Sequence, residues 1–265
     1  MCFDLDSRPP IPPIAGAAVD SKLTHLRAAD GAEFSAFHAV PSTPSGAAIM
    51  ILPDVRGLHP FYEELALRFA ENGVEAVALD YFGRTAGLVT GENRGDDFEY
   101  QSHAAQIQWD SLLLDMRAVT ADLHARPGVR AVFGTGFCMG GRFAYDSGTE
   151  ADLDMSGVIG FYGWPARGGG RGGAPSPTDR AADFTCPVLG LFGGADQGIP
   201  APAIDEFEHA LSRARIEHDI VTYPGAPHSF FDRKAAEFQD ASTDAWRRTL
   251  EFIRDHTPQE SAAAA

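Results

Sequence analysis

A cysteine flanked by glycines is the first candidate for chemistry, in the run GFCMGG at 136–141. The apolar segment 129–137 predicts a buried strand, and 139–148 predicts a helix directly after it. A sharp strand-to-helix turn with small residues two places before and after its apex is a nucleophile elbow. Free N–H groups at the helix N-terminus favour a thiolate, and the Met139 N–H can hold an oxyanion. The run therefore predicts Cys138 as a nucleophile; the alternative is a buried structural cysteine in a Gly-rich turn.

An acid and a base follow Cys138 along the chain in the order that such an elbow requires. Asp196 comes after the Gly-rich end of the apolar run 186–194, where it could accept an imidazole N–H and fix the tautomer. His228 lies in the loop after 216–224, and of nine histidines it alone has both the right order and the right location. The alternatives are a helix N-cap for Asp196 and a surface loop histidine for His228.

The loop after the apolar run 47–53 should lie beside the elbow, because this loop supplies the second oxyanion N–H in nucleophile-elbow hydrolases. The N–H of Val55 is the candidate donor. Asp54 would then lie near Cys138. Two interpretations of Asp54 stay open, an acid that acts on the thiol and a cap for the following helix.

Apolar runs alternate with segments of helical period, which predicts an α/β fold with a mostly parallel sheet and helices on both faces. Strands are expected at 47–53, 74–82, 129–137, 156–163, 186–194 and 216–224, the last of them more polar and at an edge. Helices are expected at 61–73, 104–128, 139–148, 201–215 and 237–256. An N-terminal antiparallel hairpin is expected at 22–29 and 33–40, and loops at 83–103 and 166–180. The candidate site residues then fall at the carboxyl ends of strands, where such sheets bind ligands.

The 265 residues show no linker long enough to divide two cores. We therefore expect one α/β domain at 21–256. A Pro-rich N-terminal arm is expected at 1–20, and a disordered tail at 257–265.

Charge and composition exclude several classes of partner. Lys and Arg number 21 against 37 Asp and Glu, a net charge of −16, which argues against nucleic acid and membrane surfaces. Three cysteines, no secretory signal and no apolar run of membrane-spanning length predict a cytoplasmic protein. No metal-ligand or nucleotide-binding motif is present, so we expect no cofactor and no metal. A monomer or small homo-oligomer acting on a small molecule is expected.

Across residues 22–256 the sequence resembles the dienelactone hydrolase family of the α/β-hydrolase superfamily, whose members act as carboxymethylenebutenolidases. The motifs that carry the resemblance are GFCMGG with Cys138, GGADQGIP with Asp196 and GAPHSFFD with His228, together with Ala144-Tyr145-Asp146 and Asp80-Tyr81-Phe82-Gly83-Arg84. The resemblance implies the α/β-hydrolase fold and hydrolysis of a cyclic enol ester.

The resemblance also implies roles for particular residues. In the family, an acid at the position of Asp54, usually glutamate, contacts the resting thiol and moves when substrate arrives. Two arginines hold the substrate carboxylate: Arg84 matches the first, whereas the second position is Asp232 here and Arg233 follows it. Tyr145 and Trp164 complete the expected substrate-binding residues.

The chemistry of sulfur narrows the expected substrates. Thiolate is a good leaving group, so a tetrahedral intermediate from an alkyl ester would expel sulfur and revert. Enol and aryl esters lose their oxygen more readily, and the resulting thioester would be hydrolysed by water that His228 activates. We therefore expect a Cys-His-Asp hydrolase of activated esters, most of all enol-lactones.

Other functions remain as alternatives. One is a broader carboxylesterase or thioesterase, and another is a non-catalytic α/β-hydrolase scaffold that binds a ligand. Glutamine amidotransferases share the cysteine elbow but need a His-x-Glu pair, and His228-Ser229-Phe230 lacks the glutamate. Peptidases with a cysteine elbow would carry histidine at the position of Met139.

Overall fold

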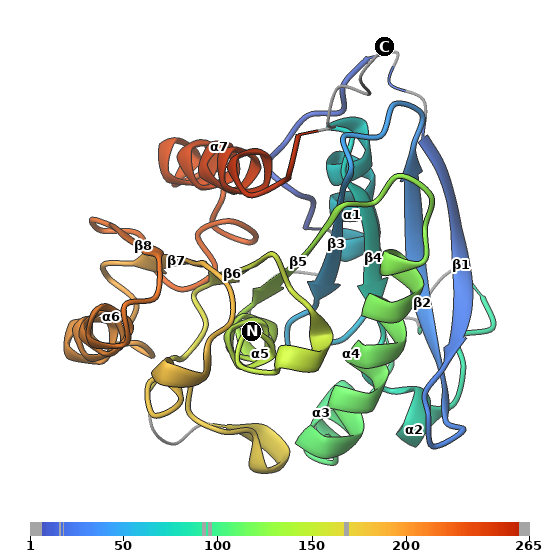
Figure 1. The fold of residues 1–265 in the computed structure, drawn as a ribbon, viewed down its shortest axis with the longest axis horizontal. Helices are drawn as coiled ribbons and strands as arrows, with labels where there is room; N and C mark the ends of the chain where they lie inside the picture. The colour runs from blue at the N-terminus through green and yellow to red at the C-terminus, as the bar shows by residue number, and fades with distance from the viewer. Residues whose placement is uncertain are drawn as a thin grey trace.

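The computed structural model describes residues 7–15, 17, 19–91, 94, 97–166 and 170–259. Within these residues one sheet of eight strands has the order β1-β2-β4-β3-β5-β6-β7-β8 (Figure 1). The strands are β1 (Val19–Arg27), β2 (Glu33–Pro41), β3 (Ala47–Leu52), β4 (Glu75–Leu79), β5 (Ala131–Phe137), β6 (Gly157–Phe161), β7 (Val188–Gly193) and β8 (His218–Tyr223). β1 and β2 form an antiparallel pair, β2 is antiparallel to β4, and every other pairing is parallel. The predicted mostly parallel sheet with an N-terminal antiparallel hairpin is confirmed.

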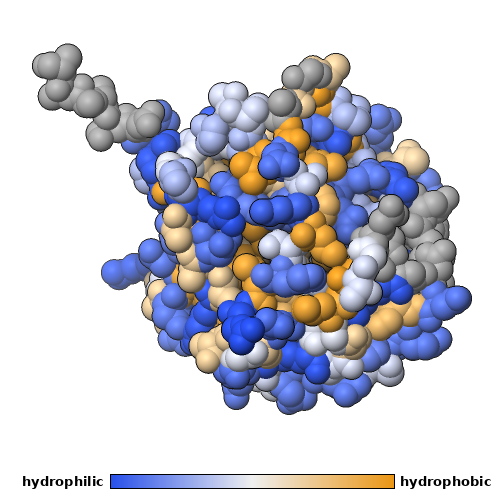
Figure 2. Space-filling model, turned by 90° about the vertical axis from the view of Figure 1, so that its right-hand side faces the viewer, coloured by the Kyte–Doolittle hydropathy of each residue, from blue (hydrophilic) through white to orange (hydrophobic). Residues whose placement is uncertain are grey.

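The central strands are apolar along their whole length because both of their faces are covered. Every residue of β3, β4, β5, β6 and β7 is buried. β8 lies at one edge, as its polar sequence predicts, and β1 lies at the other. Figure 2 faces the β1 end of the molecule, where hydrophilic side chains surround smaller apolar areas. Charged residues on an edge strand such as β1 oppose pairing with another chain.

Helices cover both faces of the sheet. The helices are α1 (Pro60–Glu71), α2 (Gly83–Ala86), α3 (Tyr100–Ala104), α4 (Trp109–His124), α5 (Met139–Ser147), α6 (Ala201–Ala214) and α7 (Gln239–Asp255), with 3-10 turns η1 (Ala151–Leu153), η2 (Arg171–Gly173) and η3 (Ala181–Asp183).

Ring contacts show which helices share a face. α1 and α7 meet through Phe69 and Trp246, whose ring centroids are 4.8 Å apart. α4, α5 and α6 cover the opposite face, where the Tyr145 ring of α5 lies 5.1 Å from Phe207 of α6. Trp109 at the start of α4 lies 6.1 Å from Phe143 of α5. The sheet is thus enclosed between two helical layers.

The boundaries of several elements differ from those predicted. β1 begins at Val19, inside the segment 1–20 predicted as an arm; residues 1–6, 16 and 18 of that segment, like 260–265 of the predicted tail, lie outside the described residues. The predicted loop 83–103 contains α2 and the start of α3. The helix predicted from residue 104 begins at Trp109, because Gln108 has an extended backbone that breaks the helical run.

Two further observations concern the ends of the chain and its helices. Arg130 donates a hydrogen bond to the carbonyl of Pro258, 3.0 Å away, so the described part of the predicted tail contacts the domain. Within the described residues, no helix combines the length and apolar character needed to cross a bilayer.

Candidate active site

The turn between β5 and α5 holds Cys138 in a backbone conformation that few residues adopt. Cys138 has φ 55° and ψ −114°, and α5 begins at the next residue. A Cβ on Gly136 would lie 2.0 Å from the carbonyl oxygen of Gly140, and one on Gly140 would lie 2.1 Å from that of Leu52. Glycine at both positions is therefore a steric requirement of the turn, because the close approach of the neighbouring backbone leaves no room for a Cβ.

Cys138 faces a cavity at the carboxyl ends of the strands. Its N–H donates to the carbonyl of Phe161 at 3.0 Å, which ties the turn to β6. The side chain is partly exposed, unlike that of a structural core cysteine such as Cys186. The cavity has a volume of about 300 Å³ and is lined by Val55, Cys138, Met139, Arg142, Phe143, Tyr162, Trp164, Arg171, Gly198, Ile199 and His228. Its walls are thus mostly apolar and aromatic, with cysteine and histidine side chains among them.

His228 is held by Asp196. Nδ1 of the imidazole lies 2.6 Å from Oδ2 of Asp196, whose side chain is buried. The other carboxylate oxygen, Oδ1, accepts the N–H of Gly198 at 2.8 Å. Asp196 therefore caps the local turn and does not cap α6, whose N-cap position is Pro200. An imidazole held at Nδ1 by a carboxylate keeps Nε2 for other chemistry.

Asp54 is fully buried at the end of β3. Its Oδ1 accepts the N–H of Arg56 at 2.8 Å, while its own N–H donates to the Tyr62 hydroxyl at 2.9 Å. The remaining oxygen, Oδ2, is buried with no hydrogen-bond partner among the described residues. Asp54 does not cap α1, whose N-cap is His59. The carboxyl thus closes its own turn and leaves one oxygen unsatisfied.

Electrostatics place Asp54 close to the other polar groups of the site. Burial raises the pKa of Asp54 to about 7, against the opposing charges of Arg56 and His228. Burial also raises the pKa of Tyr81, and the charges of Asp54 and Cys138 add to that effect. The buried Asp54 therefore lies within electrostatic range of His228, and the buried Tyr81 within range of both Asp54 and Cys138.

The two predicted oxyanion donors flank the same cavity. Val55 lies on the loop after β3, and Met139 is the first residue of α5; both line the cavity beside Cys138. The first N–H groups of a helix have no acceptor within the helix, so the Met139 N–H can turn to a ligand.

A tyrosine and an aspartate that the sequence did not single out as a pair lie beside His228. The Tyr162 ring is 4.9 Å from the imidazole, and its hydroxyl donates to Oδ2 of Asp232 at 2.8 Å. Tyr162 has φ 40°, a strained value for a tyrosine. Burial raises the pKa of Asp232 to about 8. At the position where the family resemblance implies an arginine, this chain thus holds a buried carboxyl bound to tyrosine.

Only one of the four expected substrate-binding residues, Trp164, lines the cavity with Cys138. Arg84 lines a separate cavity of about 140 Å³ and pairs with Asp115 and Asp30 at 2.7 and 2.5 Å. Tyr145 is buried below the elbow. Its hydroxyl donates to the Gly160 carbonyl at 3.0 Å.

The remaining expected residue, Arg233, is exposed and does not line the cavity. Its backbone N–H donates a hydrogen bond to Oδ1 of Asp232.

Sequence reasoning missed several residues of the cavity, among them Tyr162 and Arg171. Tyr162 directly follows a buried strand and precedes Gly163, a position where a side chain at the sheet edge could have been expected. Arg171 lies in the Gly-rich segment that the sequence predicts only as a loop. In the described part of the chain, no group of three or more His, Cys, Asp or Glu side chains could hold a metal ion.

Comparisons with known proteins identify the family of this chain. The model of the dienelactone hydrolase family matches residues 34–257. A carboxymethylenebutenolidase of Rhodococcus opacus is 30% identical over 267 residues, covering 99% of this chain and all of that protein. An assigned carboxymethylenebutenolidase of Saccharolobus solfataricus is 28% identical, covering 85% of this chain and 95% of that protein.

Solved structures agree with the family match. The crystal structure of an assigned dienelactone hydrolase from Klebsiella pneumoniae superposes with a TM-score of 0.76 at 26% identity, covering 89% of this chain and 98% of that one. The fold is that of the α/β-hydrolases, and the chain belongs to the dienelactone hydrolase family, whose members hydrolyse ester or lactone bonds.

Proposed function

We propose that this protein hydrolyses activated esters, enol-lactones above all, through a thioacyl intermediate on Cys138. The observation that carries the proposal is the shared cavity of Cys138 and His228, with Asp196 bound to Nδ1 of the imidazole at 2.6 Å. The strained turn at Cys138 supports it, because such strain persists where a side chain must be presented at one point.

The first half of the reaction opens the lactone. The Cys138 thiolate attacks the carbonyl carbon, forming a C–S bond, and the carbonyl oxygen takes up negative charge. The N–H groups of Met139 and Val55 stabilise this oxyanion; losing one such donor costs about 3–4 kcal/mol in enzymes of this kind. The bond from the carbonyl carbon to the ring oxygen then breaks. The ring opens to an enolate that stays attached to the thioester and takes a proton from water to become a ketone, leaving hydroxide to the solvent.

The second half restores the enzyme. His228 accepts a proton from water, with Asp196 stabilising the imidazolium. The hydroxide attacks the thioester carbonyl, the C–S bond breaks, and the carboxylic acid is released as its anion while the thiolate returns. One water is consumed and no redox step occurs. The thioester also explains the preference for activated substrates, because an alkoxide would leave more slowly than sulfur.

Asp54 acts on the thiol in this proposal. Its free Oδ2 and its place beside Cys138 and His228 suit a carboxyl that holds the resting thiol neutral. The family's glutamate would reach one methylene further, so Asp54 must act from a shorter side chain. Its full burial also makes its charge state responsive near neutral pH.

The test compares wild type with Cys138→Ala on 4-nitrophenyl acetate and on a dienelactone. We expect the variant to lose at least about 1,000-fold in kcat/KM on both, since the chemistry then lacks its nucleophile. Wild type should turn over the lactone faster than the aryl ester. Retained activity in Cys138→Ala would overturn the proposal, whereas turnover of the aryl ester alone would favour a broader esterase. A thioacyl intermediate should appear by intact mass when the enzyme is quenched during turnover.

A further inference from the structure

The residues that line the cavity have a net positive formal charge, although the protein as a whole is strongly acidic. Among its described lining residues are two arginines and no carboxylate, although acidic residues outnumber basic ones by 37 to 21 in the whole chain. We propose that Arg171 binds a carboxylate on the substrate and so selects anionic esters and lactones over neutral ones. This inference rests on the proposed function but assigns its specificity to a segment outside the family's motifs.

The arginine that the resemblance implies cannot readily take this role. The Arg84 guanidinium is already bound on both sides, to Asp115 at 2.7 and 3.1 Å and to Asp30 at 2.5 and 3.2 Å. It borders another cavity. A substrate anion would have to displace two carboxylates to reach it, which a charge-assisted pair of this kind opposes.

Arg142, the other arginine that lines the cavity, is engaged in hydrogen bonds that hold the structure together. It is buried, and its Nε bonds Asp146 at 3.2 Å. Its Nη1 donates to the carbonyls of Trp164 and Ala166 at 3.1 and 2.9 Å, and its Nη2 to that of Pro175. Arg142 therefore fastens the two ends of the Gly-rich segment to α5. Removing it would collapse the wall of the cavity.

Arg171 differs from both because its side chain is exposed to the cavity mouth and has no ion pair with any described residue. Its backbone is nevertheless fixed. The Ala174 N–H donates to the Arg171 carbonyl at 3.0 Å. Gly172 packs so closely on the residues just before α4 that a Cβ there would lie 2.0 Å from the carbonyl oxygen of Ile107. The guanidinium is thus free while its attachment point is held.

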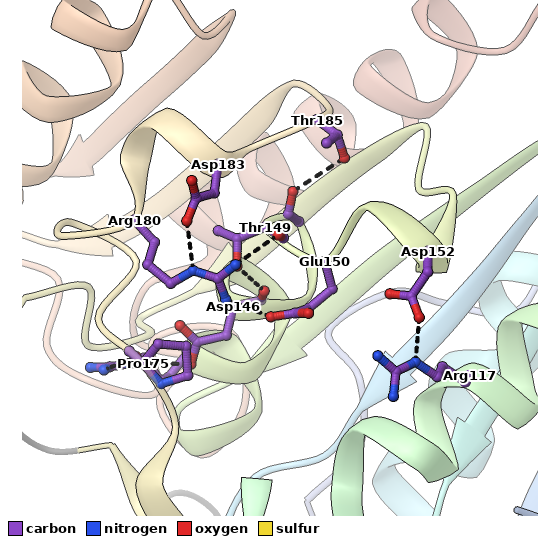
Figure 3. A network of polar contacts seen from close by, with 11 residues as sticks. Arg117, Asp146, Thr149, Glu150, Asp152, Pro175, Arg180, Asp183 and Thr185 are labelled. Carbon is purple, nitrogen blue, oxygen red and sulfur yellow. Dashed lines mark hydrogen bonds and ion pairs between the residues drawn. The ribbon is translucent and has the colours of Figure 1, made fainter. Parts of the chain in front are cut away.

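A second anchor holds the following part of the segment. Figure 3 shows Arg180 bridging to the chain after α5, where it donates to the Thr149 carbonyl at 3.0 Å and to Glu150 at 2.5 Å. It also pairs with Asp183 at 2.9 Å. Although the segment is rich in glycine, these contacts hold the loop that carries Arg171. A fixed backbone at Arg171 reduces the conformational entropy that is lost when the arginine binds an anion.

The chemistry favours a compact carboxylate. A planar guanidinium binds a carboxylate through two parallel hydrogen bonds. The cavity, about 300 Å³, suits a small acyl or lactone skeleton against Phe143, Tyr162 and Trp164. The net charge of −16 repels anions at long range, so a local guanidinium is needed to retain one.

The experiment uses matched substrates that differ in charge and by one methyl group. One pair is a carboxymethylene butenolide and its methyl ester; the other is 3-acetoxybenzoate and its methyl ester, whose carboxylate cannot attack its own acetyl group. We expect Arg171→Ala to lower kcat/KM for the anionic members roughly 10- to 100-fold, mainly through KM. The neutral members should change less than about two-fold, and Arg171→Lys should retain part of the preference.

The control is Arg213→Ala, which removes an exposed arginine from α6 and changes the net charge equally. It should leave both pairs unaffected. Equal losses on anionic and neutral members, or an unchanged preference in Arg171→Ala, would refute the role of Arg171. The proposed function fails separately, if the Cys138→Ala variant still hydrolyses these substrates. Unfolding midpoints of all variants identify any loss caused by misfolding.

Discussion

At the scale of single residues, burial keeps one carboxyl of the proposed site, that of Asp54, near its titration point. Burial raises the pKa of Asp54 to about 7, and its Oδ2 has no partner among the described residues. Below this pH the group is a neutral acid, and above it the group is a carboxylate whose charge acts on His228. Like charges repel strongly in a poorly hydrated site, so an ionised Asp54 opposes a thiolate at Cys138.

Asp54→Asn should therefore free the thiol in a pH-dependent way. We expect alkylation of Cys138 by iodoacetamide to proceed at equal rates in variant and wild type at pH 6, where Asp54 is protonated. At pH 8, where wild-type Asp54 is ionised, the variant should react roughly 3- to 10-fold faster. Asp54→Glu is the matched variant that keeps the acid. A rate ratio that does not change between pH 6 and pH 8 would show that Asp54 does not govern the thiol.

At the scale of elements, the elbow depends on how closely α5 approaches β3. The Gly140 backbone lies where a Cβ would meet the carbonyl oxygens of Leu52 and Pro53 at 2.1 and 2.3 Å. Both are backbone atoms, so they cannot rotate away as a side chain could. The same approach sets the distance between the two predicted oxyanion donors, Val55 and Met139.

Gly140→Ala should thus damage both stability and activity. We expect a loss of about 1–3 kcal/mol in the free energy of unfolding, because the added methyl group forces the strand end outward. In the fraction that folds, kcat should fall more than KM rises, because the donors separate. Gly91→Ala is the control: a Cβ at Gly91 would meet nothing within 4 Å. Urea unfolding and steady-state kinetics measure the two effects, and a variant as stable and active as Gly91→Ala would contradict the argument.

At the scale of the whole molecule, buried carboxyls couple folding to pH. Burial raises the pKa of Asp232 to about 8, as it raises that of Asp54 to about 7, from an ordinary value of 3.8. The folded chain then keeps protons that the unfolded chain releases between pH 4 and pH 8. Each group therefore lowers the free energy of unfolding as the pH rises through this window, by up to about 1.4 kcal/mol per pH unit.

Asp232→Asn should flatten this dependence. We expect the free energy of unfolding to fall less steeply between pH 5 and pH 7.5 than in wild type, while the amide oxygen still accepts the Tyr162 hydroxyl. Urea unfolding at four pH values measures the slope. An unchanged slope would mean that Asp232 titrates alike in the folded and unfolded chain.

Asp244→Asn is the control for this measurement. Burial opposes ionisation there, but hydrogen bonds from Arg247, Arg248 and Tyr223 outweigh it and lower the pKa of Asp244 to about 2. This carboxyl titrates below pH 5 in both states, so the variant should keep the wild-type slope between pH 5 and pH 7.5.

The sequence predicted most of the fold because its elements are marked locally. Continuous apolar runs identified the buried strands. The start of α4 and the short helices α2 and α3 were not predicted, because their limits depend on single backbone angles and on tertiary packing. The alternation of strands and helices was enough to predict that the site lies at the carboxyl ends of the parallel strands.

The placement of arginines shows where sequence reasoning stopped. Arg84 and Arg171 look alike as residues, yet Arg84 is bound by two carboxylates and Arg171 lines the cavity. No local pattern distinguishes them, because the carboxylates that occupy Arg84 lie 54 and 31 positions away in the chain.

By itself, the sequence determined the elbow, its two glycines and the order Cys138, Asp196, His228, because local sterics and chain order set these features. Only the tertiary structure decided which charges meet. The burial of Asp54, the pairing of Tyr162 with Asp232 and the lack of an ion pair between Arg171 and any described residue all depend on segments far apart in sequence. Dehydration and charge pairing depend on every neighbour in space, and packing alone brings those neighbours together.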